Sequence, residues 1–210
     1  MNDNEIHRRP RSLDAIQADA KRIGFGFASA SEEKTGALLA AMAASKPEGR
    51  FLEIGTGVGH GTAWMLEGAD QSSCIETVDS NPDTVAIARR HLGMDPRVTF
   101  HVADGARFIS GIRGKSYDLI FADAWPGKFS QLDETLSLLC AGGLYVADDL
   151  LPQANWPEGQ GDRVPELLEA LESHRDFFVV RMAWASGIVV AVRTGAQQAL
   201  AVDAPEAVRR

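Results

Sequence analysis

The chain has 210 residues, and its composition excludes several classes of protein. Hydrophobic residues make up 45% of the chain and charged residues 24%, which is typical of a folded globular protein and not of a disordered or fibrous one. The formal net charge is −8 at pH 7, and Lys and Arg form no long basic stripe, so a phosphate backbone is a poor partner. We therefore expect one α/β domain that acts on a small molecule and does not bind nucleic acid.

The N-terminal segment and the cysteines indicate a compartment. Residues 1–11 are polar and precede no apolar signal segment, and no apolar run is long enough to span a membrane. Cys74 and Cys140 each lie in an apolar segment, so we expect two buried free thiols and no disulfide. These features favour a cytoplasmic protein without a membrane partner.

Two helices are expected first, over residues 12–22 and 31–45, with a break at Phe25-Gly26-Phe27 between them. Both helices precede the first expected strand. We treat residues 1–49 as an N-terminal helical segment and expect it to serve as a lid or as a contact surface in a homodimer.

From residue 50 onward, short apolar runs alternate with helical patterns. The expected strands are 51–54, 74–78, 98–102, 117–122 and 144–147. The expected helices are 61–66, 82–92, 106–110, 130–139 (ending at Gly142-Gly143) and 165–173. Such alternation is typical of a parallel sheet with helices on both of its faces.

Two β-rich runs, 177–184 and 188–192, close the pattern. Ala185-Ser186-Gly187 separates them, and this hairpin spacing makes the two strands antiparallel. The predicted domain over residues 50–193 is therefore a mostly parallel α/β sheet that ends in an antiparallel hairpin. Residues 194–210 are expected to form a loosely ordered tail.

A glycine-rich segment follows the first expected strand and opens the next helix. Its glycines let the backbone turn sharply and approach a ligand, and the helix N-terminus supplies free N–H groups. A nicotinamide dinucleotide fingerprint would require glycine at position 60 or 62, which are His60 and Thr62, so its register fails. Glu53 precedes the first glycine by two residues, where a carboxylate can face a cationic cofactor such as S-adenosylmethionine (SAM), which carries an ammonium and a sulfonium. A purely structural turn is the alternative. The candidate cofactor residues here are Glu53, Gly55, Thr56, Gly57, Gly59 and His60.

Acids also end the second and third expected strands. Asp79, followed by Ser80, lies where a carboxylate can accept both hydroxyls of a ribose. Asp104, with Gly105 and Ala106, is placed to meet an adenine ring. Each of the two acids could instead be an ordinary cap of the helix that follows it.

Three further acids end the fourth and fifth expected strands. Asp123 follows one strand, and Asp148 and Asp149 follow the other. Ligands bind at the carboxyl ends of strands in open α/β sheets, so we expect the three carboxylates to converge, and converging carboxylates repel one another unless they are neutralised. A hard divalent cation such as Mg²⁺ would neutralise them and lower the pKa of a coordinated hydroxyl. The alternative is that Asp149 caps a loop and Asp148 only contacts backbone amides.

Four segments together resemble the catechol and caffeoyl-CoA O-methyltransferase family. They are Glu53-Ile54-Gly55-Thr56 with Gly59, Asp79-Ser80-Asn81-Pro82, Phe121-Ala122-Asp123-Ala124-Trp125 and Ala147-Asp148-Asp149. The resemblance extends over about Ser29 to Val192 and includes Ser31-Glu32-Glu33-Lys34-Thr35-Gly36. It implies a Rossmann-like SAM methyltransferase fold in which Glu53 lies by the methionine end of SAM, Asp79 holds the ribose and Trp125 packs on the adenine. It also implies that Asp123, Asp148 and Asp149 bind the metal.

The chain departs from that family at two positions. The third metal ligand is usually Asn, whereas this chain has Asp149, which adds a negative charge. The catechol enzyme has its catalytic lysine three residues after the metal aspartate, where this chain has Pro126. Lys128 is therefore the candidate catalytic base, beside Asp123, and a solvated loop lysine is the alternative. His60 is a second basic candidate.

The function that these patterns predict is SAM-dependent O-methylation of a small phenolic or catechol-like acceptor, with a divalent metal. One rival is a metal-independent SAM methyltransferase that acts on nitrogen, carbon or a carboxylate. A second is a catalytically silent SAM-binding protein. A nicotinamide oxidoreductase comes third because of the failed glycine register.

Overall fold

The computed structural model describes residues 5–25, 29–153 and 156–195. Within them, the strands are β1 (Arg50–Ile54), β2 (Cys74–Asp79), β3 (Val98–Val102), β4 (Tyr117–Ala122), β5 (Leu139–Ala147), β6 (Phe177–Met182) and β7 (Ile188–Arg193). The helices are α1 (Leu13–Arg22), α2 (Ser29–Ala44), α3 (His60–Gly68), α4 (Pro82–Leu92), α5 (Gly105–Gly111), α6 (Leu132–Ser137) and α7 (Gln160–Ser173).

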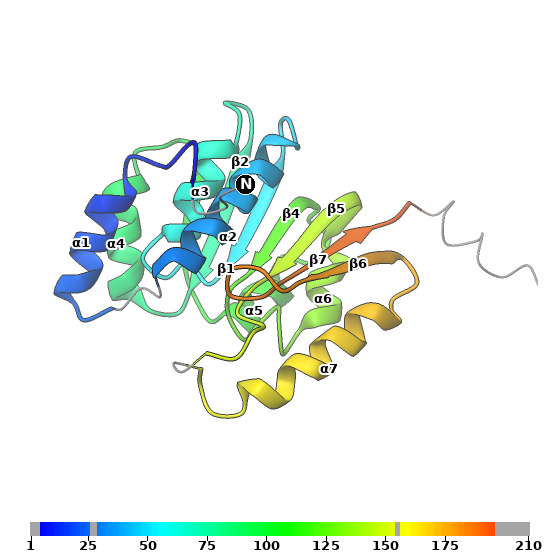
Figure 1. The fold of residues 1–210 in the computed structure, drawn as a ribbon. Helices are drawn as coiled ribbons and strands as arrows, with labels where there is room; N and C mark the ends of the chain where they lie inside the picture. Colours follow the sequence, from blue (N-terminus) through cyan, green and yellow to red (C-terminus); the bar gives the residue numbers. More distant parts are fainter. Residues whose placement is uncertain (1–4, 26–28, 154–155, 196–210) are drawn as a thin grey trace, which may run out of the picture.

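One seven-stranded sheet runs through the molecule in the order β3-β2-β1-β4-β5-β7-β6 (Figure 1). The first five strands in this order pair in parallel, whereas β7 pairs antiparallel with both β5 and β6. The strand order reverses between β1 and β4, and in open α/β sheets ligands bind at such a reversal, outside the carboxyl ends of the strands. The predicted Rossmann-like fold with a C-terminal antiparallel hairpin is confirmed.

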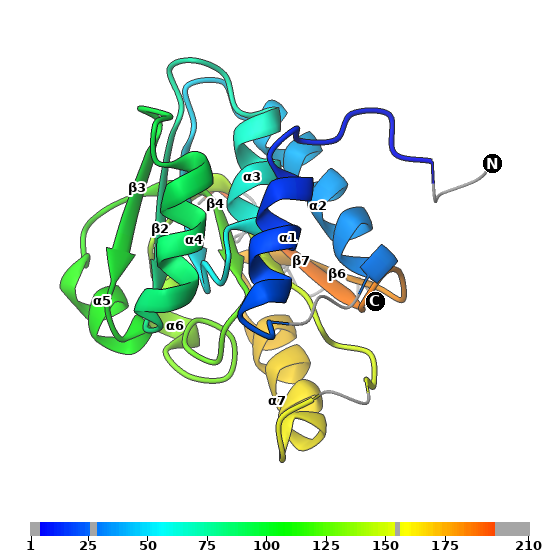
Figure 2. The same cartoon turned by 90° about the vertical axis from the view of Figure 1, so that its left-hand side faces the viewer.

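Helices cover both faces of the sheet (Figures 1 and 2). Alternate strand residues point to opposite faces, so that Phe51 joins a core under α1, α2, α3 and α4 while Leu52 joins a core under α5, α6 and α7. Trp64 of α3 is fully buried in the first core, and Tyr145 of β5 in the second. The sheet edge that carries the acids is therefore held between two packed layers.

The N-terminal helices are part of the first helical layer. Helix α1 lies beside α4, and α2 packs on α3 (Figure 2). Asp19 of α1 fixes the first contact because it accepts hydrogen bonds from Arg90 at 2.8 Å and pairs with the ring of His91 at 2.9 Å, both on α4. The lid or dimer role of residues 1–49 stays a prediction. The expected tail over residues 194–210 lies outside the described residues after 195.

Several sequence-based element boundaries are wrong. The expected helix 130–139 is shorter, since α6 ends at Ser137, and β5 already begins at Leu139. Gly142-Gly143 lies inside β5, where Gly142 has φ 77° and the pairing with β4 shifts register. The glycines therefore accommodate an irregularity in a strand and do not end a helix.

Helix α7 begins five residues before the expected start, so Pro165 lies inside it and not at its first turn. The expectation of two buried thiols is also wrong. Both cysteines are free, but Cys74 is exposed at the start of β2 and Cys140 is half-buried. Among the described residues, no helix has the length and apolar character needed to cross a membrane.

Candidate cofactor and metal site

The glycine loop connects β1 to α3 in a conformation that needs glycine. Gly55, Gly57 and Gly59 have φ values of 107°, 49° and 93°. A Cβ at Gly55 would lie 2.7 Å from the main-chain oxygen of Asp123, so a side chain there would force the loop away from β4. The loop can therefore run close to the acid that follows β4.

Glu53 is buried beneath this loop, and threonines surround its carboxylate. One oxygen, Oε2, accepts a hydrogen bond from Thr62 of α3 and another from Thr77 of β2 at 2.5 Å. Thr56 in turn hydrogen-bonds Thr77 at 2.6 Å between hydroxyl oxygens. Burial raises the pKa of Glu53 from 4.5 to about 7, against the opposing effect of the two hydroxyl donors.

The side chain of Asp79 ties the end of β2 to the glycine loop. Its Oδ2 accepts the N–H of Gly57 and its Oδ1 the N–H of Asn81, each at 2.8 Å. Each carboxylate oxygen has a second lone-pair direction, so these bonds leave acceptor capacity for ribose hydroxyls. The ribose contact predicted for Asp79 and its neighbour Ser80, which is exposed, remains compatible with this geometry.

The residues predicted to meet an adenine lie on an exposed surface beyond Asp79. Asp104 caps α5 by accepting the N–H of Arg107 at 2.9 Å, and Gly105 and Ala106, in the first turn of that helix, are half-buried. Trp125 is 39% exposed and packs edge-on against Phe129, with 5.3 Å between ring centroids. Their adenine contacts stay predictions.

The three aspartates at the ends of β4 and β5 do converge. Asp123, Asp148 and Asp149 each offer a carboxylate oxygen, and these three atoms lie within 4.8 Å of one another. Desolvation by the surrounding protein and repulsion from Asp148 raise the pKa of Asp123 well above its ordinary range. Burial likewise raises the pKa of Asp148, although the nearby ammonium of Lys128 opposes the rise. Without a counter-cation, Asp123 and Asp148 are therefore harder to ionise than free aspartates.

A tightly bonded turn holds Asp149 in place. The residue adopts φ 59°, a backbone conformation that is uncommon for residues other than glycine and that is enriched at functional sites. Gln153 donates to its Oδ1 at 2.6 Å, and Gln160 of α7 donates to its main-chain oxygen at 3.0 Å. The next residue, Leu150, donates its N–H to Gly187 in the β6–β7 turn at 3.1 Å. The hairpin and α7 therefore fix the third acid.

Lys128 lies behind the acid cluster and is 4% exposed. Its Nζ donates to the main-chain oxygen of Asp148 at 2.9 Å and lies 3.8 Å from the carboxylate Oδ1 of the same residue. The side chain borders a separate hollow with Phe129 and Arg163. This position indicates a lysine that fixes Asp148 and offsets its charge. It argues against the alternative of a solvated loop lysine. The catalytic role of Lys128 stays a prediction.

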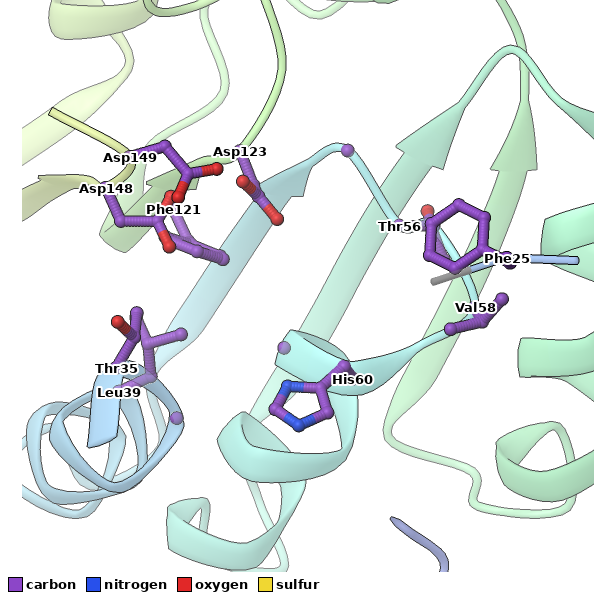
Figure 3. A pocket seen from close by; sticks show the side chains of 14 residues that line it. Phe25, Thr35, Leu39, Thr56, Val58, His60, Phe121, Asp123, Asp148 and Asp149 are labelled. Atoms are coloured by element: carbon purple, nitrogen blue, oxygen red, sulfur yellow. The ribbon is translucent and has the colours of Figure 1, made fainter. Parts of the chain in front are cut away.

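A cavity of about 240 Å³ joins the glycine loop to the acid cluster (Figure 3). Gly55, Thr56 and Val58 line one end, and the three aspartates line the other. His60, in the first turn of α3, lines it between these ends. Burial lowers the pKa of His60 to about 4, so its imidazole is neutral at pH 7.

Several buried polar atoms around this cavity have no hydrogen-bond partner within the described residues. They are Thr35 Oγ1, Glu53 Oε1, Trp64 Nε1 and Asp148 Oδ1. Thr35 lines the cavity, and Trp64 packs directly on Gly36, which lines it too. Buried polar groups in native proteins are normally hydrogen-bonded, so this concentration indicates a polar ligand in the cavity.

The sequence reasoning missed the wall that the N-terminal helices contribute. Thr35, Gly36 and Leu39 of α2 line the cavity opposite the acids, and Phe25 covers the glycine loop (Figure 3). The family resemblance includes Thr35 and Gly36 but implies no role for them in the site, and the local pattern of α2 does not separate Leu39 from other helix residues. Only the packing of Gly36 against Trp64, which brings α2 close to α3, places them at the site.

Comparison with known proteins gives the same assignment as the sequence motifs. Residues 52–150 match a family model described as a methyltransferase domain. A provisionally named O-methyltransferase of Mycolicibacterium smegmatis is 33% identical over 147 residues, which are 66% of this chain and 69% of that protein. Another, from Mycobacterium sp. (strain KMS), is 32% identical over 141 residues, and the match spans 64% of each chain.

A solved structure has the same fold at lower identity. The O-methyltransferase TomG from Streptomyces achromogenes, solved in complex with SAM, is 20% identical with a TM-score of 0.74, covering 90% of this chain and 92% of that one. Its likeness supports the fold, and the more similar mycobacterial relatives support the family. The chain thus belongs to the O-methyltransferase family of class I SAM-dependent methyltransferases.

Proposed function

We propose that the protein transfers the methyl group of SAM to a hydroxyl of a small phenolic or catechol-like acceptor, with a divalent cation at the acid cluster. The observation that carries this proposal is the meeting of two predicted sites in one cavity. The glycine loop lines one end of it and Asp123, Asp148 and Asp149 line the other. A methyl donor held by the glycine loop would there lie close to an acceptor held at the acid cluster.

The cavity fits one end of SAM. Its volume of about 240 Å³ is smaller than most whole-ligand pockets, and Asp79, Asp104 and Trp125 lie outside its lining, along the open surface. The methionine end would occupy the enclosed part, near Glu53 and the aspartates, whose negative charges favour a cation. The nucleoside would then extend over Asp79 toward Trp125.

The acid cluster fits a hard divalent cation. Carboxylate oxygens are the ligands that Mg²⁺ prefers, and Asp148 Oδ1 is buried without a hydrogen bond from any described residue. Among the described residues, only the ammonium of Lys128 pairs with Asp148, so the cluster keeps a net negative charge when all three aspartates are ionised. The positive charge of a cation would satisfy the cluster and lower the pKa of an acceptor hydroxyl held there.

The residues of this chain mainly provide alignment. Transfer breaks the bond between the methyl carbon and sulfur, leaves the electron pair on sulfur, and forms a carbon–oxygen bond to the acceptor, whose proton passes to solvent. Glu53 and the glycine loop hold the donor at one end of the cavity, and Asp123 lies nearest the junction because it follows β4 directly beside Gly55. Holding two reactants in line removes much of the entropic barrier.

His60 and Lys128 differ in their suitability as the base. His60 lines the cavity and is neutral, but its pKa of about 4 makes it a weak proton acceptor. Lys128 borders another hollow, and its ammonium is bonded to Asp148. A cation held by Asp123, Asp148 and Asp149 would lower the pKa of the acceptor hydroxyl, and neither His60 nor Lys128 would then need to be a strong base.

The variant Asp123→Asn tests the proposal. It keeps the shape of the side chain but removes one cation ligand charge, so we expect turnover with Mg²⁺ to fall at least about a hundredfold. Binding of SAM should survive, which calorimetry would show. Full metal-dependent turnover in this variant would refute the cation site. Turnover of the wild type that chelation leaves unchanged would instead favour a metal-independent methyltransferase.

A further inference from the structure

Glu53 is oriented by two hydroxyl donors on the same oxygen. Thr62 and Thr77 come from different elements, α3 and β2, and both donate to Oε2. The other oxygen, Oε1, has no hydrogen-bond partner within the described residues. The two hydroxyls therefore hold the carboxylate by Oε2, and no described side chain donates to Oε1.

The second oxygen lies directly under the cavity wall. A Cβ built on Gly61 would lie 2.3 Å from Glu53 Oε1 and 3.1 Å from the ring of Phe121, and both Gly61 and Phe121 line the cavity. Only the backbone of a glycine therefore separates Oε1 from the enclosed space. Burial reduces solvent screening, so an ionised Glu53 would act strongly across so short a distance, and a cationic ligand would favour this ionised form.

The hydroxyl of Thr77 also fixes which groups donate and which accept in a chain of hydrogen bonds that runs from Thr56 to Glu53. A threonine hydroxyl has one hydrogen, and that of Thr77 is used by Glu53. Thr56 must therefore donate to Thr77 across the 2.6 Å contact, so its oxygen can act only as an acceptor. Thr56 lines the cavity, so the acceptor capacity left on its hydroxyl oxygen suits a hydrogen-bond donor of a ligand.

We propose that Thr77 is a positioning residue of the cofactor site, which turns Glu53 Oε1 toward the cavity and thereby supports binding of the cationic end of SAM. The proposal rests on SAM being the ligand. Thr77 is fully buried within β2 and does not line the cavity, so it acts through Glu53 and Thr56.

The test compares two ligands that differ in cationic groups. SAM carries the ammonium and the sulfonium, whereas 5′-methylthioadenosine keeps the nucleoside and lacks both. Because the Glu53 carboxylate loses one of the two hydroxyls that orient it, Thr77→Val should weaken SAM binding about tenfold or more. It should leave 5′-methylthioadenosine binding within about twofold, and Thr77→Ser, which keeps the hydroxyl, should restore SAM binding.

Matched variants separate orientation from packing. Thr135→Val removes another fully buried threonine hydroxyl, which bonds the main-chain oxygen of Gln131 at 2.8 Å, and should change neither affinity. In a Glu53→Gln background, Thr77→Val should cause no further loss of SAM affinity. If Thr77→Val does not fold, Thr62→Val carries the same expectation because it frees the same oxygen.

Two results would overturn the proposal. Equal losses for SAM and 5′-methylthioadenosine would show that Thr77 only packs the sheet, and unchanged SAM affinity in Thr77→Val would show that the orientation of Glu53 does not matter. Wild-type protein that binds neither ligand would overturn the proposed function itself, so the two failures are distinguishable.

Discussion

The buried carboxyl of Glu53 should make stability depend on pH in a defined direction. Its pKa rises from 4.5 to about 7 in the folded chain, mainly through burial and further through the negative charge of Asp79. A folded state that binds a proton more tightly than the unfolded state gains stability at low pH. This contribution is fully present below pH 4.5 and is lost as the pH rises toward 7 and above. A pKa difference of this size corresponds to about 3 kcal/mol.

The variant Glu53→Gln isolates this contribution. It keeps the shape of the side chain and an oxygen for Thr62 and Thr77, but it cannot ionise. Urea unfolding without ligand, measured from about pH 4 to pH 8, gives the free energy of unfolding for both proteins. The difference between the variant and the wild type should change by about 3 kcal/mol across this interval, in favour of the variant at high pH. A difference that stays constant with pH would refute the argument that Glu53 is held protonated by burial.

Three further predictions concern the loop and the acid cluster. Gly55→Ala should weaken SAM binding at least about tenfold in calorimetry, because φ 107° and the nearby main-chain oxygen of Asp123 exclude a Cβ. Unchanged binding would contradict the claim that the loop needs glycine at this position. Lys128→Met should weaken Mn²⁺ binding, because Asp148 loses the donor that fixes its main chain. Electron paramagnetic resonance would measure this binding. Unaltered Mn²⁺ binding with lost turnover would instead support a catalytic lysine. Asp149→Asn keeps an acceptor for Gln153 and removes one negative charge, so Mn²⁺ affinity should fall severalfold while the melting temperature holds. Unchanged affinity would show that the charge of Asp149 does not contribute to cation binding.

The sheet and the position of the acids were predictable because both follow from local patterns. Parallel strands place their carboxyl ends at one edge, so Asp123 and Asp148, each following a strand, had to meet once β4 and β5 paired. The hairpin of β6 and β7 was equally readable from its turn spacing. The correct predictions thus depended on local sequence patterns and on the rule that parallel strands place their carboxyl ends at one edge of the sheet.

The errors arose where one pattern allows two structures. Leu139 and Cys140 continue the apolar face of a helix, but they also begin a strand, and the pairing of Leu139 with Tyr117 of β4 favours the strand. Two glycines then read as a helix end, although they form a strand irregularity. Thr35 and Phe25 could not be assigned to the site, because only the docking of α2 on α3 and the turn after α1 bring them to the cavity.

The most direct test of the proposed function follows the methyl group itself. Purified protein is incubated with methyl-labelled SAM and a panel of phenols and catechols, with Mg²⁺ or Mn²⁺ and in parallel with a chelator. The arrangement of glycine loop and acid cluster predicts a labelled methyl ether that forms with the cation and disappears on chelation. SAM that binds tightly but transfers no label to any acceptor, with or without cation, would contradict it and favour a silent SAM-binding protein.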